Sequence, residues 1–176
     1  MESRKQVADL LRKATFATTV LRAAIIVGKG GSSTQIMCDL VEKLPLMIAP
    51  KSLENACQPI ALSSVLYSLL GVMGQPLSYN KTFDIGGLDV LWYKEMLYTI
   101  AKIKGLKRKI ITVPWISPRF EAHWFYFITS APYCVAVNLA NNMRNRVVCQ
   151  ENLIDQIVQV KRMTFEDAVR ITLGIY

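Results

Sequence analysis

The sequence predicts an α/β fold, because β-branched apolar runs alternate with amphipathic helical segments along much of the chain. Three runs have the composition of buried strands: Thr18–Val27, Thr82–Ile85 and Lys109–Val113. The segments between them have helical periodicity, and parallel strands need such crossovers. We therefore expect two or three short, mostly parallel strands with several packed helices.

The totals fit one globular unit over residues 1–176, with about 117–176 mainly helical. The net charge of +8 comes from 21 Lys and Arg against 13 Asp and Glu, but the basic residues are scattered. The densest run, Lys102–Lys109, contains Gly105 and Leu106 and is typical of a helix end and turn. We therefore expect no nucleic-acid partner. A basic protein that binds membrane surfaces or nucleic acid is the weaker alternative.

The four cysteines form no C-x-x-C pair, and with a single histidine they indicate no metal site. They are Cys38, Cys57, Cys134 and Cys149. Met1 is followed by Glu-Ser-Arg-Lys-Gln rather than by an apolar leader, so we expect reduced thiols and a cytoplasmic location. Pro132 and Asn138 interrupt the apolar segment 124–140, which favours two packed helices over a membrane span. An interfacial helix that contacts lipid is the alternative there.

Helices are predicted from apolar periodicity and capping residues. The expected helices are residues 2–13, Ser33–Lys43 capped by Ser32 or Ser33, Ser63–Val72 capped by Ser63, Leu91–Lys104 after Asp89, and a C-terminal helix capped by Thr164 with Asp167. Leu46–Ile48 is a short apolar piece between two prolines, and residues 51–57 are expected to form a polar loop. The glycines at 28, 30 and 31 form a strand-to-helix turn that can hold an anion or a carboxamide, or simply connect the two elements.

Several segments, taken in order, resemble a known family. They are Ser3–Leu11, Thr19–Gly28, Leu44–Pro50, Gln58–Ala61, Thr82–Gly87, Ile111–Pro114 and Ser117–Arg119. The series resembles atypical short-chain dehydrogenase/reductases, in particular NAD(P)-binding NmrA-like and NAD-dependent epimerase-like proteins. The resemblance implies the C-terminal portion of a Rossmann-like fold.

The resemblance also implies that parts of the family's site lie upstream of Met1. The family's Gly-rich dinucleotide turn is absent, because Gly28, Gly30 and Gly31 do not have the G-x-x-G-x-x-G spacing. The lysine of the family's Tyr-x-x-x-Lys pair would fall near Arg4 or Lys5, and its tyrosine before Met1. We therefore assign no catalytic residue.

The resemblance places the nicotinamide end of the cofactor at Arg22, Ala23 and Ala24. Many relatives have Arg-Pro-Gly there, so the two alanines depart from the pattern. Arg22 has a second interpretation, as a structural arginine paired with a carboxylate. Ser32, Ser33 and Gln58 are the substrate-binding candidates, since hydroxyl and amide groups suit a polar organic substrate. Alternatively, Ser33 only caps a helix and Gln58 is a loop residue.

Other candidates are given structural interpretations. His123 could act as a base, but it lies among aromatic residues where a packed or surface histidine is more usual. The aromatic group Trp115, Phe120, Trp124, Phe125, Tyr126 and Phe127 packs a core or walls a substrate pocket. Asp84 ends a strand and is expected to cap or orient Gly86 and Gly87.

The predicted function is the substrate-side part of an NAD(P)-dependent oxidoreductase or nucleotide-sugar-epimerase-like protein, inactive alone. Its partners are then NAD or NADP in the intact parent and a small-molecule substrate, with no metal. The alternative is a non-catalytic NmrA-like module that senses redox cofactors. An exposed sheet edge favours self-association.

Overall fold

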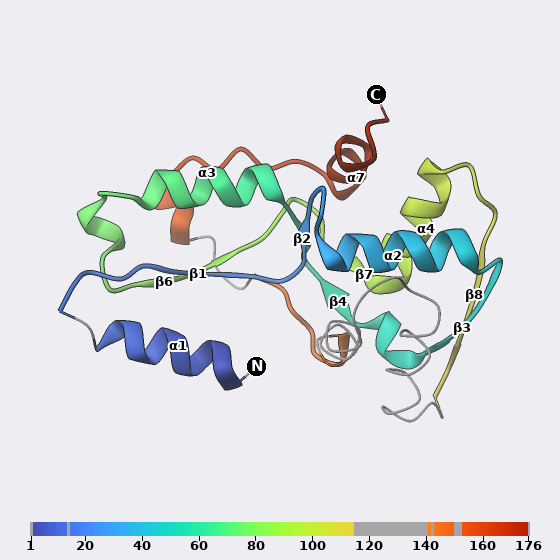
Figure 1. The fold of residues 1–176 in the computed structure, drawn as a ribbon, viewed down its shortest axis with the longest axis horizontal. Coiled ribbons are helices and arrows are strands. Elements are labelled where there is room, and N and C mark those ends of the chain that lie inside the picture. The colour runs from blue at the N-terminus through green and yellow to red at the C-terminus, as the bar shows by residue number, and fades with distance from the viewer. Residues whose placement is uncertain (1, 14, 115–140, 142, 150–152, 176) are drawn as a thin grey trace.

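The structure is a computed structural model that describes residues 2–13, 15–114, 141, 143–149 and 153–175. Within these ranges, short strands form four pairs, of which three are parallel and one is antiparallel (Figure 1). The predicted α/β class with mostly parallel strands is confirmed, although the strands are more numerous and shorter than expected. The helices lie around these pairs rather than over one broad sheet.

The segment 18–27 forms two strands rather than the single predicted one. β1 (Val20–Ala23) pairs with β6 (Thr82–Ile85), whereas β2 (Ile26–Val27) pairs with β5 (Ile60–Ala61), both in parallel. The prediction of one continuous strand is wrong because its two halves have different partners. The chain leaves one pair and joins the other at Ala24 and Ile25.

β3 (Leu46–Pro50) pairs in parallel with β8 (Lys109–Val113), and β4 (Ala56–Cys57) pairs antiparallel with β7 (Leu91–Trp92). The apolar piece at 46–48 is therefore part of a strand, in which Met47 is buried and Ile48 exposed. The polar loop predicted at 51–57 is wrong, because this segment contains the 3-10 turn η1 (Lys51–Glu54) and then β4.

The helices are α1 (Glu2–Arg12), α2 (Ser32–Lys43), α3 (Leu62–Val72), α4 (Tyr93–Ile103) and α7 (Phe165–Leu173), with 3-10 turns η2 (Pro76–Ser78) and η3 (Leu153–Gln156). The β1–β6 pair runs between α1 and α3 (Figure 1). The predicted helix end in the basic run is confirmed, since α4 ends at Ile103 and Gly105 has a φ of 66°.

Two of the predicted helix caps are wrong. The N-cap of α2 is Gly31 rather than Ser32 or Ser33, and the N-cap of α3 is Ala61 rather than Ser63. Neither helix has a side-chain cap, because it begins directly from a strand or a glycine turn. The predicted cap of α7 is confirmed, since the backbone N–H of Asp167 donates to Thr164 Oγ1 at 3.1 Å.

The core has two parts. The larger cluster includes Ile36, Met47, Met96, Ile100 and Val169, and the smaller includes Ile60, Val65, Phe83, Ile85 and Ile154. No helix among the described residues is long and apolar enough to cross a membrane. The helices predicted on either side of residues 130–132 lie outside the described residues, as does about half of the segment 117–176 that is predicted to be mainly helical.

Candidate functional site

The carboxyl ends of β1 and β6 lie at one edge, where Arg22 and Asp84 face each other in register. Arg22 Nε lies 2.7 Å from Asp84 Oδ1, and Arg22 Nη2 lies 3.0 Å from Asp84 Oδ2. Of the two interpretations of Arg22, the paired arginine is thus present in the structure. The expectation for Asp84 is corrected, because its carboxylate binds Arg22 rather than the following glycines.

Ala23 and Ala24, the other cofactor candidates, lie where β1 gives way to β2. Both are partly buried; Ala23 packs against the smaller core cluster and Ala24 against the larger one.

Gln58 is buried, and both ends of its amide are hydrogen-bonded within the protein. Gln58 Nε2 donates to Gly87 O at 2.8 Å, and Gln58 Oε1 accepts from the backbone N–H of Cys149 at 2.9 Å. A Cβ on Gly86 would lie 2.4 Å from Gln58 Cδ, so the glutamine occupies the space that a side chain there would need. Through these two hydrogen bonds, Gln58 links the chain just before β5 to Gly87 and to Cys149.

The turn after β2 leads into the first turn of α2. The backbone N–H of Gly31 donates to Gly28 O at 3.1 Å. Ser32 is exposed and Ser33 half-buried, so both candidate hydroxyls stand at the start of the helix. Thr34, missed by the sequence analysis, is 3% exposed, and its Oγ1 has no hydrogen-bond partner within the described residues. The run Ser32-Ser33-Thr34 directly after Gly31 is the sequence pattern that could have indicated Thr34.

α2 and α3 begin next to each other. A Cβ on Gly28 would lie 2.7 Å from Leu62 Cβ, at the first residue of α3. Each helix follows one strand of the parallel β2–β5 pair, and neither has a side-chain cap or an acidic residue in its first turn. Backbone N–H groups and helix dipoles at such ends favour anionic or hydrogen-bond-accepting ligands.

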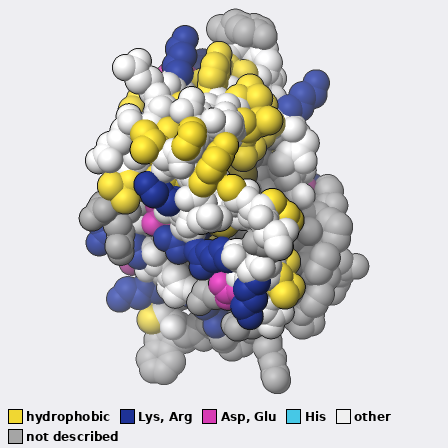
Figure 2. All heavy atoms as spheres, turned by 90° about the vertical axis from the view of Figure 1, so that its left-hand side faces the viewer, with side chains coloured by type: hydrophobic (Ala, Val, Ile, Leu, Met, Phe, Trp, Pro, Cys, Tyr) yellow, Lys and Arg dark blue, Asp and Glu magenta, His cyan; other side chains and the backbone are white. Residues whose placement is uncertain are grey.

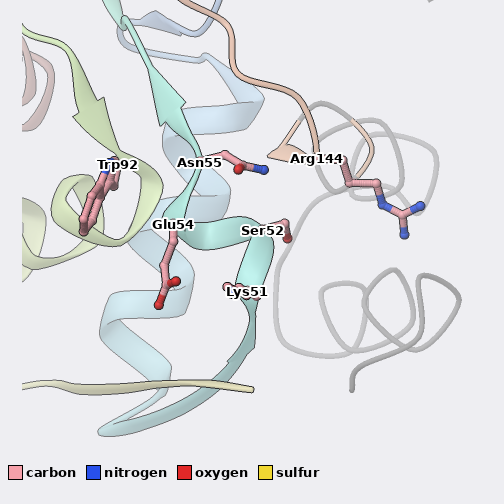
Figure 3. A pocket seen from close by; sticks show the side chains of 6 residues that line it. All are labelled: Lys51, Ser52, Glu54, Asn55, Trp92 and Arg144. Carbon is pink, nitrogen blue, oxygen red and sulfur yellow. The ribbon is translucent and has the colours of Figure 1, made fainter. Parts of the chain in front are cut away.

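A polar cavity of about 490 Å³ lies near η1 (Figure 3). It is lined by Lys51, Ser52, Glu54, Asn55, Trp92 and Arg144. Glu54 Oε1 accepts from Thr112 Oγ1 at 2.6 Å, and Asn55 Nδ2 donates to Met143 O at 2.7 Å. Trp92 and Arg144 stand at opposite ends of the cavity. The sequence analysis missed it because its residues come from three distant segments.

The Cys57 thiol and the Tyr93 phenol, both buried near this region, are held in their neutral forms. Burial raises the pKa of Cys57 to about 11, although its hydrogen bond with Tyr93 acts in the opposite direction. Burial also raises the pKa of Tyr93, and the neighbouring Cys57 adds to that effect. Neither group is therefore an activated nucleophile or base at neutral pH.

Cys38 and Cys57 are free thiols, and among the described residues no group of three His, Cys, Asp or Glu side chains could hold a metal ion. Cys134, His123 and the aromatic group of residues 115–127 lie outside the described residues. The described part of the site thus offers main-chain groups, hydroxyls, an amide and an ion pair.

This arrangement of parallel strand pairs and crossover helices is that of a Rossmann-like α/β protein. Solved structures with the same fold include an NADPH-dependent oxidoreductase and nucleotide-sugar epimerases. An NADPH-dependent quinone oxidoreductase from Escherichia coli matches with a TM-score of 0.75 at 11% identity, over 98% of this chain and 61% of the other.

Two further structures show the same likeness. A nucleoside-diphosphate-sugar epimerase from Staphylococcus aureus matches with a TM-score of 0.68 at 14% identity, over 94% of this chain and 56% of the other. The third structure is a UDP-glucuronic acid 4-epimerase from Bacillus cereus in complex with UDP-glucuronic acid and NAD. It matches with a TM-score of 0.65 at 10% identity, over 98% of this chain and 49% of the other. No protein-family model and no curated protein matches the sequence. The chain thus spans about half to three fifths of the structures whose fold it shares.

Proposed function

We propose that this chain is the C-terminal, substrate-side part of an NAD(P)-dependent oxidoreductase or nucleotide-sugar-epimerase-like protein. The observation that carries the proposal is the fold, which agrees over nearly the whole chain with nicotinamide-dependent oxidoreductases and epimerases at TM-scores of 0.65 to 0.75. This chain covers only 49% to 61% of those proteins, so the proposal concerns one side of a shared site.

In this proposal the nicotinamide of NAD or NADP lies against Arg22, Ala23 and Ala24. The two small side chains suit a flat ring, and the Asp84 carboxylate holds the Arg22 guanidinium in place. The chain contains no Gly-rich dinucleotide turn, so the residues present fit the nicotinamide end and not the pyrophosphate. The cofactor supplies the hydride, and this chain orients the ring.

The substrate lies at the start of α2, against Ser32 and Ser33. The uncapped helix end and the free Thr34 hydroxyl support a small organic substrate with an acidic or oxygen-rich group. Gln58 is the third candidate; its bonds to Gly87 and Cys149 give it the role of shaping the edge. No metal is needed for this chemistry.

The proposal is tested by titrating the purified chain with NADH and NADPH and following the fluorescence of the cofactor. We expect no saturation at micromolar concentrations and no turnover, because the pyrophosphate-binding turn is not in this chain. Tight binding of either cofactor would contradict it. Arg22→Ala in the longer parent should weaken cofactor binding, while Arg170→Ala, on α7 and paired with Glu166, serves as the control.

The second candidate is a non-catalytic NmrA-like module that senses redox cofactors. It is favoured by the absence of a Tyr-x-x-x-Lys pair at the family's position near the first helix, since no tyrosine precedes Tyr67. The coding sequence upstream discriminates the two: a Gly-rich turn with a Tyr–Lys pair supports the enzyme, and the turn alone supports the sensor. Both candidates are proposed to be cytoplasmic.

Two weaker proposals concern partners. The outer edge of β1 can pair with another strand, because β1 pairs only with β6 among the described residues, and self-association through it is one consequence. The charge of +8 can draw the chain to heparin or anionic vesicles; binding that disappears at modest salt would be nonspecific electrostatics.

A further inference from the structure

Helix α3 is apolar on both of its faces. Its inner face buries Val65, Ser68 and Val72, and Ser64 Oγ fixes it by donating to Lys161 O at 2.8 Å. The helix contains no charged residue. A helix that is apolar all round is normally buried on all sides, yet the outer side of α3 faces solvent in the single chain.

The exposed side chains on that side form what we call the α3 outer face. It consists of Leu62, Leu66, Leu69, Leu70, Met73 and Leu77, which are between 40% and 71% exposed. Figure 2 shows apolar side chains gathered over one part of the molecule, at the end where α3 and η2 lie in Figure 1. Isolated exposed leucines are ordinary, but a contiguous group of this size indicates an interaction surface.

The spacing within the α3 outer face indicates a helical partner. Leu62, Leu66, Leu69 and Met73 follow one another at intervals of four, three and four residues, which is the repeat of a seam between two packed helices. By contrast, α2 exposes polar residues such as Gln35, Glu42 and Lys43. Unlike α2, α3 therefore has an exposed side suited to another helix.

We propose that the α3 outer face is the contact between two copies of this chain, with α3 packed on α3 across a two-fold axis. A two-fold contact places each patch against its own copy, which suits a face with no charges to repel one another. With Tyr67 and Tyr79 at its margin, the face exposes on the order of 800 Å² of side chain, about one partner's share of a standard interface.

This contact is separate from the edge of β1 and does not depend on the proposed cofactor. The test is sedimentation velocity of the purified chain at about 1 to 100 micromolar, where interfaces of this size span association and dissociation. We expect a concentration-dependent dimer. Leu70→Glu, at a position 68% exposed, should weaken it by at least ~100-fold, because the carboxylate would be buried without a partner.

Leu10→Glu is the matched control, since Leu10 is 69% exposed on α1 and should leave the dimer intact. Circular dichroism and the urea midpoint show whether each variant folds, and Leu70→Met should retain the dimer. A monomer at every concentration overturns the proposal. So does a dimer that survives Leu70→Glu but is lost with Leu21→Pro, which would assign the contact to β1. Binding of the monomer to phosphatidylcholine–phosphatidylserine vesicles, lost in Leu70→Glu, would assign the face to lipid instead.

Discussion

Arg22 and Asp84 form a two-pronged ion pair across the β1–β6 pair, with nitrogen–oxygen distances of 2.7 Å and 3.0 Å. Arg22 is the last residue but one of β1, and Asp84 holds the same position in β6. The pair therefore joins two strands from distant parts of the sequence at the edge where the ligand is proposed to lie.

The first prediction concerns the strength of this pair. The Arg22 and Asp84 side chains are 64% and 30% exposed, so water screens their attraction. A double-mutant cycle with Arg22→Ala and Asp84→Ala, followed by urea unfolding, should give a coupling of about 0.5 to 1 kcal/mol. Arg22→Lys should lose most of that coupling, because lysine cannot make the two parallel bonds.

The Asp9–Arg12 pair on α1 provides the control, since its charges are 3.3 Å apart and well exposed. Its cycle should give about 0.5 kcal/mol or less. A coupling at Arg22 no larger than that of the control would mean that the pair only positions side chains. A coupling well above about 1 kcal/mol would mean that solvent screens the pair less than the exposure indicates.

The second prediction concerns the contact of Gly86 with Gln58. Gly86→Ala should lower the free energy of unfolding by about 2 to 3 kcal/mol, because the new methyl group displaces the glutamine from its two hydrogen bonds. The double variant Gly86→Ala, Gln58→Ala should lose much less free energy of unfolding than the sum of the losses of the two single variants. Urea unfolding measures all three variants.

Gly74→Ala is the control for the backbone alone. Gly74 has a φ of 70° and open space around it, so alanine there should cost only about 1 kcal/mol. The contact would be contradicted if the double variant lost as much free energy of unfolding as the two single variants together. The methyl group at residue 86 would then destabilise the protein through a neighbour other than Gln58.

Local patterns were enough to predict some elements. Thr82–Ile85 and Lys109–Val113 are strands, and Thr164 caps α7 through Asp167, because each depends on residues close in sequence. The division of segment 18–27 was not predictable in this way. Its two halves are separated by the positions of their partners, which lie about 35 to 60 residues further on.

The candidate site was also predictable only in part. The sequence indicated the candidate residues Arg22, Ser32, Ser33 and Gln58, but not the hydrogen-bond partners that decide what each of them can do. Asp84 lies 62 residues from Arg22, and Cys149 lies 91 residues from Gln58. Hydrogen bonds between such distant residues leave no periodic pattern in the sequence, so their roles follow only from the fold.

The third prediction concerns the buried hydroxyl of Thr34. Since Thr34 Oγ1 has no hydrogen-bond partner in the part of the chain that the structure describes, Thr34→Val removes an unsatisfied polar group without changing the shape or the branching of the side chain. We expect the free energy of unfolding to rise by about 0.5 to 1 kcal/mol. Thr172→Val is the control and should lower it, because Thr172 Oγ1 donates to Ala168 O at 2.7 Å. A loss at Thr34 as large as at Thr172 would show that this hydroxyl has a partner in solution.

The last prediction concerns stability at alkaline pH. Burial raises the pKa of Cys57 from 9.0 to about 11, so between these values the unfolded chain releases a proton that the folded protein keeps. Stability from this thiol is complete below about pH 8 and is lost as the pH rises above 9. The slope approaches about 1.4 kcal/mol per pH unit.

Urea unfolding at intervals between about pH 8 and 10 measures that slope, below the range in which Tyr93 adds its own effect. Cys57→Ala should remove from the slope of the free energy of unfolding against pH nearly the whole contribution of one proton. The same variant should be less stable at pH 8, because it leaves a small cavity. Cys149→Ala, which removes a half-buried thiol, should leave the slope much closer to that of the unmodified protein. If the free energy of unfolding fell equally steeply with pH in Cys57→Ala and in the unmodified protein, water would reach the Cys57 thiol in solution. The junction between β4 and α4 would then be open to water as well.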